Sequence, residues 1–151
     1  MTQQLQRRFK KALNEKNWRE CLASYNQLEQ LNVNDASNNE PNTAKQTVNV
    51  TDSSSLIELL VKNDQVRDAT HVAENILAAD AYPIPKIFRF LLNRLASNGD
   101  VHAMSALGRY LTPRVKKEVS FDNRLCNAYL AAGQGQVYLD MLQKDVDDII
   151  R

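Results

Sequence analysis

The sequence contains little of several residue types, and each scarcity excludes a class of protein. Only four glycines occur in 151 residues, and none follows a strand, so no glycine-rich loop can cradle a phosphate. Two cysteines, Cys21 and Cys126, lie far apart without metal-ligand spacing, which favours a reduced, intracellular setting over a disulfide framework. No apolar run approaches the roughly 18 residues of a membrane-spanning helix, and the N-terminus lacks the apolar core of a secretory signal.

Charge and strand patterning are also weak. The formal net charge is +1, which gives no overall attraction to nucleic acid or to an anionic membrane. Residues 1–16 are basic and amphipathic, as in an organelle presequence, but their acidic residues and their pairing with the next helix favour a folded role. Period-two alternation is missing throughout. We therefore predict an all-α fold.

Three stretches of the chain align with one another. Leu56–Ala69, Leu91–Met104 and Leu125–Tyr138 begin at positions 56, 91 and 125, which are 35 and 34 residues apart. A recurring unit of this length is typical of stacked helical arrays, in which each unit buries its apolar face against its neighbours. The repeat predicts a binding surface rather than a catalytic pocket.

The chain divides into three predicted regions. Residues 1–31 read as an N-terminal helical hairpin, with Asn17 as the N-cap of its second helix. Residues 32–53, rich in Asn, Ser and Thr, read as a flexible linker, and the Asn49 glycosylation sequon there is interpreted as a chance match. Residues 54–151 read as three helical hairpins. Their predicted helices span 56–61, 66–79, 86–98, 100–111, 120–132 and 134–150, with hinges at 64, 99 and 133. A short helical turn over 112–117 is also predicted, because Thr112-Pro113 has the cap-then-proline form of a helix start.

The register of these hairpins resembles the pentatricopeptide repeat (PPR) family. Its pattern runs Leu-Ile, four residues, Lys, one residue, Gly, four residues, Ala. Matching residues are Leu56, Ile57, Lys62 and Ala69 in the first unit, Leu91, Leu92 and Gly99 in the second, and Leu125 and Gly133 in the third. Asp64, Met104 and Tyr138 depart from the pattern, and Cys21–Leu28 resembles the second helix of a fourth, degenerate unit. The resemblance implies a right-handed α-solenoid that forms part of a longer protein.

The resemblance also implies a function. PPR arrays bind single-stranded RNA at roughly one base per repeat, read by two or three side chains. Matched by position, the first readers are Ser54, Arg89 and Asn123, and the second readers are Ile84 and Glu118. Ile84 has no hydrogen-bonding group, and the Arg89–Glu118 combination favours a salt bridge. Two of three units therefore break the reading code, and any RNA affinity should be modest and tolerant of sequence.

One basic segment adds a second reason to consider RNA. Residues 86–117 carry seven Lys or Arg residues against Asp100, a net charge of +6. Arg114, Lys116 and Lys117 lie together in a predicted loop, where they would attract a phosphate backbone. The alternative is that these are scattered solvated charges that shield an ordinary helix pair.

The remaining candidate sites are weak. His71 and Glu74 lie three residues apart, but no second such pair accompanies them and His102 stands alone, so we expect no metal site and no cofactor. Cys126 lies in an apolar helix without a neighbouring base, so we expect a buried hydrophobe rather than a nucleophile. The C-terminal aspartates suit a solvated end or a contact for a basic partner: Asp140, Asp145, Asp147 and Asp148. We expect no catalytic residue and no enzyme activity.

Two hypotheses follow. In the first, the chain is a non-catalytic module of a mitochondrial PPR protein that binds and stabilises messenger RNA; the family implies a matrix location and a small RNA-binding partner subunit. In the second, the same hairpins form a protein-interaction scaffold with little or no RNA contact. Neither hypothesis involves a membrane. The long linker would also allow the N-terminal hairpin to swap between molecules.

Overall fold

The computed structural model describes residues 2–36 and 48–150, and these residues form nine α-helices and no strand. The prediction of an all-α fold is confirmed. The chain divides into two compact units, Met1–Leu91 and Leu92–Arg151, with the division inside helix α5 (Pro85–Ser97). Within the described part of the chain, no helix has the length and apolar character needed to cross a lipid bilayer.

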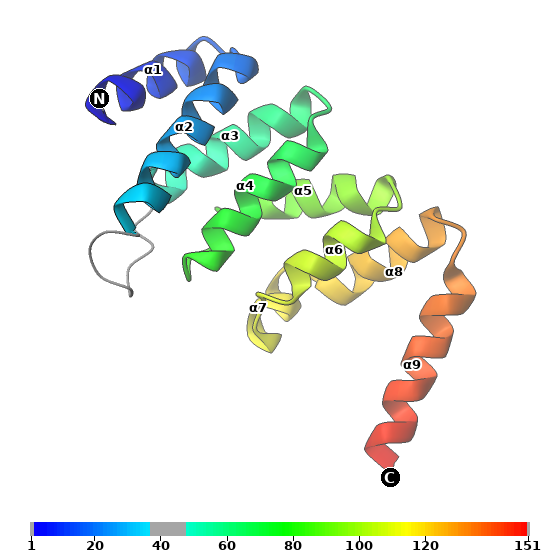
Figure 1. Ribbon diagram of the computed structural model, residues 1–151. Helices are drawn as coiled ribbons and strands as arrows, with labels where there is room; N and C mark the ends of the chain where they lie inside the picture. The colour runs from blue at the N-terminus through cyan, green and yellow to red at the C-terminus, as the bar shows by residue number, and fades with distance from the viewer. Residues whose placement is uncertain (1, 37–47, 151) are drawn as a thin grey trace. The chain divides into compact units, whose positions relative to one another are not determined.

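The first unit contains two helical hairpins (Figure 1). Helices α1 (Thr2–Asn14) and α2 (Trp18–Ala36) form the first, and α3 (Val50–Lys62) and α4 (Val66–Ala78) form the second. Both α1 and α2 contact α3, so the N-terminal hairpin packs on the same chain. The start of α5 belongs to this unit. Hairpin swapping between molecules stays a prediction.

Aromatic and aliphatic side chains fill the space between the helices of the first unit. Phe9 and Tyr25 are buried, with ring centroids 6.4 Å apart. The Tyr25 hydroxyl accepts a hydrogen bond of 3.2 Å from the Asn75 amide, which ties α2 to α4. The Cys21 Sγ lies 3.9 Å from the Phe9 carbonyl oxygen, and burial raises the pKa of this thiol to about 12. Cys21 is therefore a packed, protonated thiol in the core.

The second unit contains the end of α5 and four further helices: α6 (Val101–Gly108), α7 (Pro113–Glu118), α8 (Phe121–Ala131) and α9 (Gly135–Ile150). Helix α8 contacts α6, α7 and α9 (Figure 1). A methyl group added to Gly108 would lie 2.6 Å from the Phe121 ring, which shows how closely α6 approaches the start of α8. Phe121 is consequently buried at the centre of this unit.

The four turns inside the helical hairpins share one backbone geometry, which Asp80 (φ 62°) also adopts after α4. Each has a residue in the left-handed conformation: Lys16 (φ 58°), Asp64 (φ 61°), Gly99 (φ 69°) and Gly133 (φ 70°). The next residue donates its N–H to the carbonyl five positions earlier, at 2.8–3.0 Å: Asn17 to Ala12, Gln65 to Leu60, Asp100 to Leu95 and Gln134 to Tyr129. This bond satisfies a helix-end carbonyl, as in a Schellman turn. The predicted hinges at 64, 99 and 133 are confirmed.

The distance of a residue from the hinge also determines whether its side chain is buried. The residue five positions after each hinge begins the packing of the second helix. Cys21, Ala69 and Met104 are fully buried at this position, whereas Tyr138 in the last hairpin is half-buried. The N-terminal hairpin thus repeats the pattern of its successors, although its sequence matches the repeat poorly.

Several predicted boundaries differ from the structure. Helix α2 continues to Ala36, and α3 begins at Val50 rather than in the predicted range from 54 onward. Asn49 is the N-cap of α3, and its side chain accepts the Asp52 N–H at 2.7 Å, which gives this residue of the sequon a structural role. Helix α6 ends at Gly108, three residues early. The rest of the predicted linker, 37–47, lies outside the described residues.

Candidate nucleic-acid interface

An open cavity of about 580 Å³ lies where α7 meets the start of α8. Thr112 begins α7 as its N-cap, accepting the Val115 N–H at 3.3 Å, and Pro113 occupies the first helical position, as predicted. Ser120 (φ 49°) then turns the chain sharply into α8. The cavity is lined by residues from both sides of this turn: Pro113, Lys116, Lys117, Ser120, Phe121, Asp122 and Asn123.

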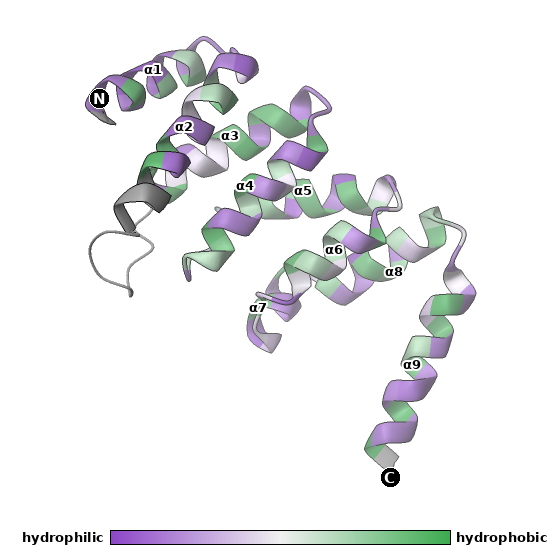
Figure 2. Ribbon diagram, viewed as in Figure 1, coloured by the Kyte–Doolittle hydropathy of each residue, from purple (hydrophilic) through white to green (hydrophobic). Residues whose placement is uncertain are grey.

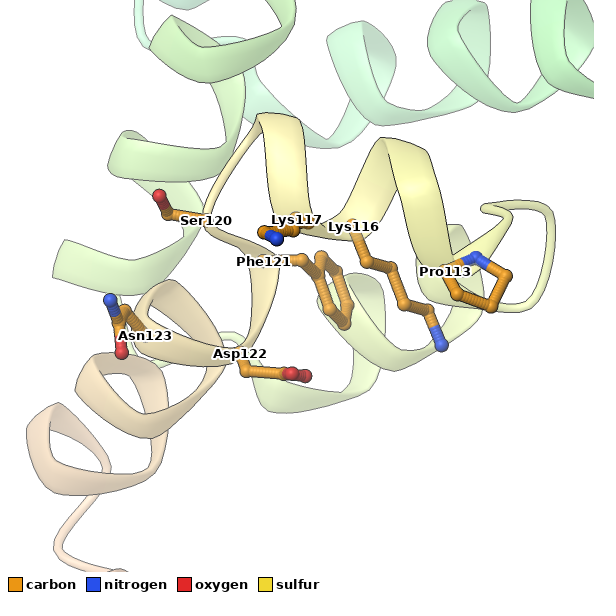
Figure 3. A pocket seen from close by; sticks show the side chains of 7 residues that line it. All are labelled: Pro113, Lys116, Lys117, Ser120, Phe121, Asp122 and Asn123. Atoms are coloured by element: carbon orange, nitrogen blue, oxygen red, sulfur yellow. The ribbon is translucent and has the colours of Figure 1, made fainter.

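The turn brings three of the predicted RNA-binding residues to one place. Lys116, Lys117 and Asn123 all line the cavity (Figure 3). Lys116 Nζ lies 5.7 Å from the centroid of the Phe121 ring, a cation–π arrangement that positions this lysine against an apolar floor. Asn123 is exposed in the first turn of α8, where its amide can donate and accept hydrogen bonds.

The chemistry of this cavity suits a phosphate backbone better than a base. Phe121 is only 3% exposed, so its ring offers no face on which a base could stack. Asp122 contributes one negative charge beside Lys116 and Lys117, leaving a local charge of +1. Arg114 is not among the lining residues, and its Nε pairs with Glu118 at 3.3 Å, both side chains being exposed. The attraction of this site for an anion is therefore modest.

Ser54, the first predicted reader, cannot face RNA in this structure. It is fully buried in α3, and its Oγ accepts the Ile84 N–H at 3.0 Å. The two residues matched as the readers of one unit are thus bonded to each other across 30 positions. The bond satisfies the Ile84 amide, in the segment that leads into α5, and it also gives the buried Ser54 hydroxyl a hydrogen-bond partner.

The other predicted readers, Arg89, Glu118 and Ile84, are not among the residues that line the cavity. Arg89 is half-buried on α5. Glu118 forms an ion pair with Arg114, one helical turn earlier, and the predicted Arg89–Glu118 salt bridge stays a prediction. Ile84 has only its backbone engaged, through Ser54.

Among the described residues, the titratable side chains outside the cavity form no cluster of the kind that holds a metal ion. Within residues 2–36 and 48–150, no three His, Cys, Asp or Glu side chains gather as they would around a metal ion. His71 and His102 are exposed, and Cys126 is half-buried rather than fully buried as expected. Glu29 on α2 is half-buried; burial raises the pKa of its carboxyl, and nearby His71 partly offsets that increase.

Four lining residues had not been predicted as part of a binding site: Pro113, Ser120, Phe121 and Asp122. Ser120 and Phe121 come three and four residues after Lys117 in the sequence, but no local pattern there indicates the left-handed conformation of Ser120 that folds the two sides together. Comparison with protein-family models, with curated proteins and with solved structures gives no match for this chain.

Proposed function

We propose that this chain is a non-catalytic helical-repeat module of the PPR type, from a mitochondrial protein that binds messenger RNA and supports its stability. Its hairpins would stack as a right-handed α-solenoid. The shared left-handed hinges at 64, 99 and 133, with their 34- and 35-residue spacing, support this reading. Residues 119–133 also resemble the animal mitochondrial leucine-rich PPR-motif protein and its insect relatives.

The observation that carries the RNA part of the proposal is the cavity between α7 and α8. Lys116, Lys117 and Asn123 all line it, and the PPR resemblance matches Asn123 to the base-facing position of the third unit. The two ammonium groups would contact phosphates while the Asn123 amide touches a base edge. Because the cavity exposes no aromatic ring, we expect contact with the backbone to dominate and sequence preference to be slight.

The test is a fluorescence titration of the full chain with labelled single-stranded RNAs of different sequence, across a salt series. Two phosphate contacts on a single strand predict a slope of log affinity against log salt of about −1.4. Lys116→Ala/Lys117→Ala should abolish most binding. Lys86→Ala/Lys144→Ala removes the same charge elsewhere and serves as the matched control. Asp122→Asn should strengthen binding, since it removes the opposing carboxylate.

Tight binding of one preferred sequence that persists at high salt would contradict this mechanism. An equal loss of affinity in the control variant would show that the cavity is not the contact.

One observation favours a second candidate, a protein-interaction scaffold with little direct RNA contact. Ser54 is buried and Ile84 has no base-reading group, so the first unit presents neither matched reader to a ligand. A protein partner, such as the small RNA-binding subunit that the family resemblance implies, would then supply the RNA contact. A pull-down from mitochondrial extract after nuclease treatment tests this: loss of all associated protein once RNA is destroyed would reject it.

A further inference from the structure

The last helix carries an apolar stripe that the described parts of the chain leave uncovered. Leu139, Leu142, Val146 and Ile149 are 58%, 43%, 47% and 84% exposed. Helix α9 meets α8 through its first turns, where Met141 Sδ lies 3.1 Å from the Tyr129 hydroxyl and the Tyr129 and Tyr138 rings have centroids 5.2 Å apart, while the four stripe residues remain exposed. Hydrophobic residues recur along α9 in Figure 2.

The spacing of the stripe is that of a helix-pairing seam. Positions 139, 142, 146 and 149 follow one another at intervals of three, four and three. These are the a and d positions of two heptads, which face a single neighbouring helix when knobs pack into holes. Singly exposed hydrophobes elsewhere, such as Tyr82 and Tyr110, show no such series. The stripe therefore has the form of a surface that receives a helix.

The charges on α9 decide what kind of helix fits. The helix carries one lysine, Lys144, and four aspartates, Asp140, Asp145, Asp147 and Asp148, which give it a net charge of −3. Of these, Asp145 lies at the position directly beside the seam. Pairing of α9 with a second copy of itself would bring two acidic helices together, which is unfavourable. Basic residues flanking the partner's apolar stripe would instead find opposite charges.

The basic helix of this chain does not meet the requirement in a second copy. Helix α1 carries Arg7, Arg8, Lys10 and Lys11, but the apolar residues Phe9 and Ala12 on it are already buried. Its exposed surface is polar, so it has no seam to offer α9. Charge complementarity thus points to a basic amphipathic helix other than α1.

We propose that α9 binds an amphipathic helix of a partner protein, one whose apolar side chains repeat every three and four residues and whose flanking positions carry lysine or arginine. The helix would lie along Leu139, Leu142, Val146 and Ile149. The apolar contact supplies affinity, and Asp145 with its acidic neighbours supplies the choice of partner. This inference does not depend on RNA binding, and it is compatible with both of the functions proposed above.

The experiment uses the full chain and three synthetic helical peptides, each about three heptads long. One has an apolar seam with lysine at the flanking positions, the second has the same seam with glutamate there, and the third keeps the lysines but has serine in the seam. Fluorescence anisotropy should show the first peptide binding about tenfold or more tightly than either other peptide. Its affinity should fall as salt is raised, because part of the attraction is between charges.

Variants of the chain locate the contact. Leu142→Asn/Ile149→Asn should abolish peptide binding, and circular dichroism should show that the helices remain, since both side chains are exposed. Val137→Asn is the matched control, because Val137 is similarly exposed (49%) but lies off the stripe. Asp145→Lys should shift the preference toward the glutamate peptide.

Three results would overturn the proposal. Sedimentation could show a dimer of the chain that the Leu142→Asn/Ile149→Asn variant dissociates, which would make a second copy the occupant. The lysine and glutamate peptides could bind equally well. The chain could also stay monomeric and bind none of the three peptides.

Discussion

The first and the last hairpins turn through the same hinge but bury their apolar residues to very different degrees. Around Lys16, the hairpin α1–α2 encloses Phe9, Cys21 and Leu28, each at most 2% exposed. Around Gly133, the hairpin α8–α9 leaves Leu142 and Ile149 in solvent. The hinge is set by local hydrogen bonds, whereas burial requires a neighbour. Both helices of the first hairpin contact α3, whereas in the last hairpin α8 contacts α6 and α7 and α9 contacts α8. A hairpin of this kind forms locally and is completed by what packs on it.

The largest expected effect on stability comes from truncating one leucine side chain to alanine in each hairpin. Leu28→Ala removes a fully buried side chain and should lower the free energy of unfolding by about 3 kcal/mol, because it leaves a cavity. Leu142→Ala removes an exposed side chain and should change it by about 0.5 kcal/mol or less. Urea unfolding followed by circular dichroism measures both. Equal losses would mean that α9 is covered in solution and that the contrast between the hairpins does not hold.

An intermediate effect is expected at two glycine hinges of identical backbone conformation. A Cβ at Gly99 would lie 2.9 Å from the Ala132 nitrogen, while a Cβ at Gly133 meets nothing within 4 Å. Gly133→Ala should therefore cost only the left-handed backbone strain, about 1 kcal/mol. Gly99→Ala adds an overlap with the backbone after α8 and should cost about 2–3 kcal/mol.

Thermal unfolding of the two variants separates the cost of conformation from the cost of packing. If Gly133→Ala were destabilised as much as Gly99→Ala, a side chain at position 133 would have to clash with a neighbour, and the structure has none within 4 Å of it.

The smallest expected effect concerns a carboxyl group in the first hairpin. Burial raises the pKa of Glu29 above its ordinary value of 4.5, so the folded state holds this proton more tightly than the unfolded state does. Ionised Glu29 then costs stability, and this cost appears as pH rises through the raised pKa. Glu29→Gln should make the chain more stable at pH 7 by about a few tenths of a kcal/mol, since the group is half-exposed.

The same pair of proteins provides the control for this prediction. Well below pH 4.5 the wild-type carboxyl is protonated in both states, and the stability difference should shrink toward zero. A difference that instead grows as the pH is lowered would show that the Glu29 carboxylate is stabilised in the fold.

The sequence predicted what local chemistry determines. Gly99 and Gly133 marked hinges because they adopt positive φ freely, and Thr112-Pro113 marked the start of α7 because cap and proline act within one turn. Asn17 was correctly identified as a cap, with its Oδ1 accepting the Glu20 N–H at 3.3 Å.

The misses concern residues whose role depends on distant parts of the chain or on competing local signals. Ser54 was matched to a base reader, but its partner is the amide of Ile84, 30 positions away, and no local pattern reveals that pairing. The start of α3 was placed late because Asn, Thr and Ser residues resemble a linker, although the same Asn49 that suggests a sequon also caps the helix. Of the candidate cavity, the lysines and Asn123 were predicted, whereas the fold of Ser120 that unites them was not.

The distribution of charge along α9 has a consequence for its own persistence. Aligned peptide dipoles leave the end of a helix partly negative, so cations stabilise a last turn and anions weaken it. Helix α9 ends with Asp145, Asp147 and Asp148 in this region and has no basic residue in its last turn. Its final turns should fray, exchanging amide hydrogens with solvent faster than the buried helix α3. Contact with positive charge would slow that exchange and leave a fully wound helix in place of a fluctuating one.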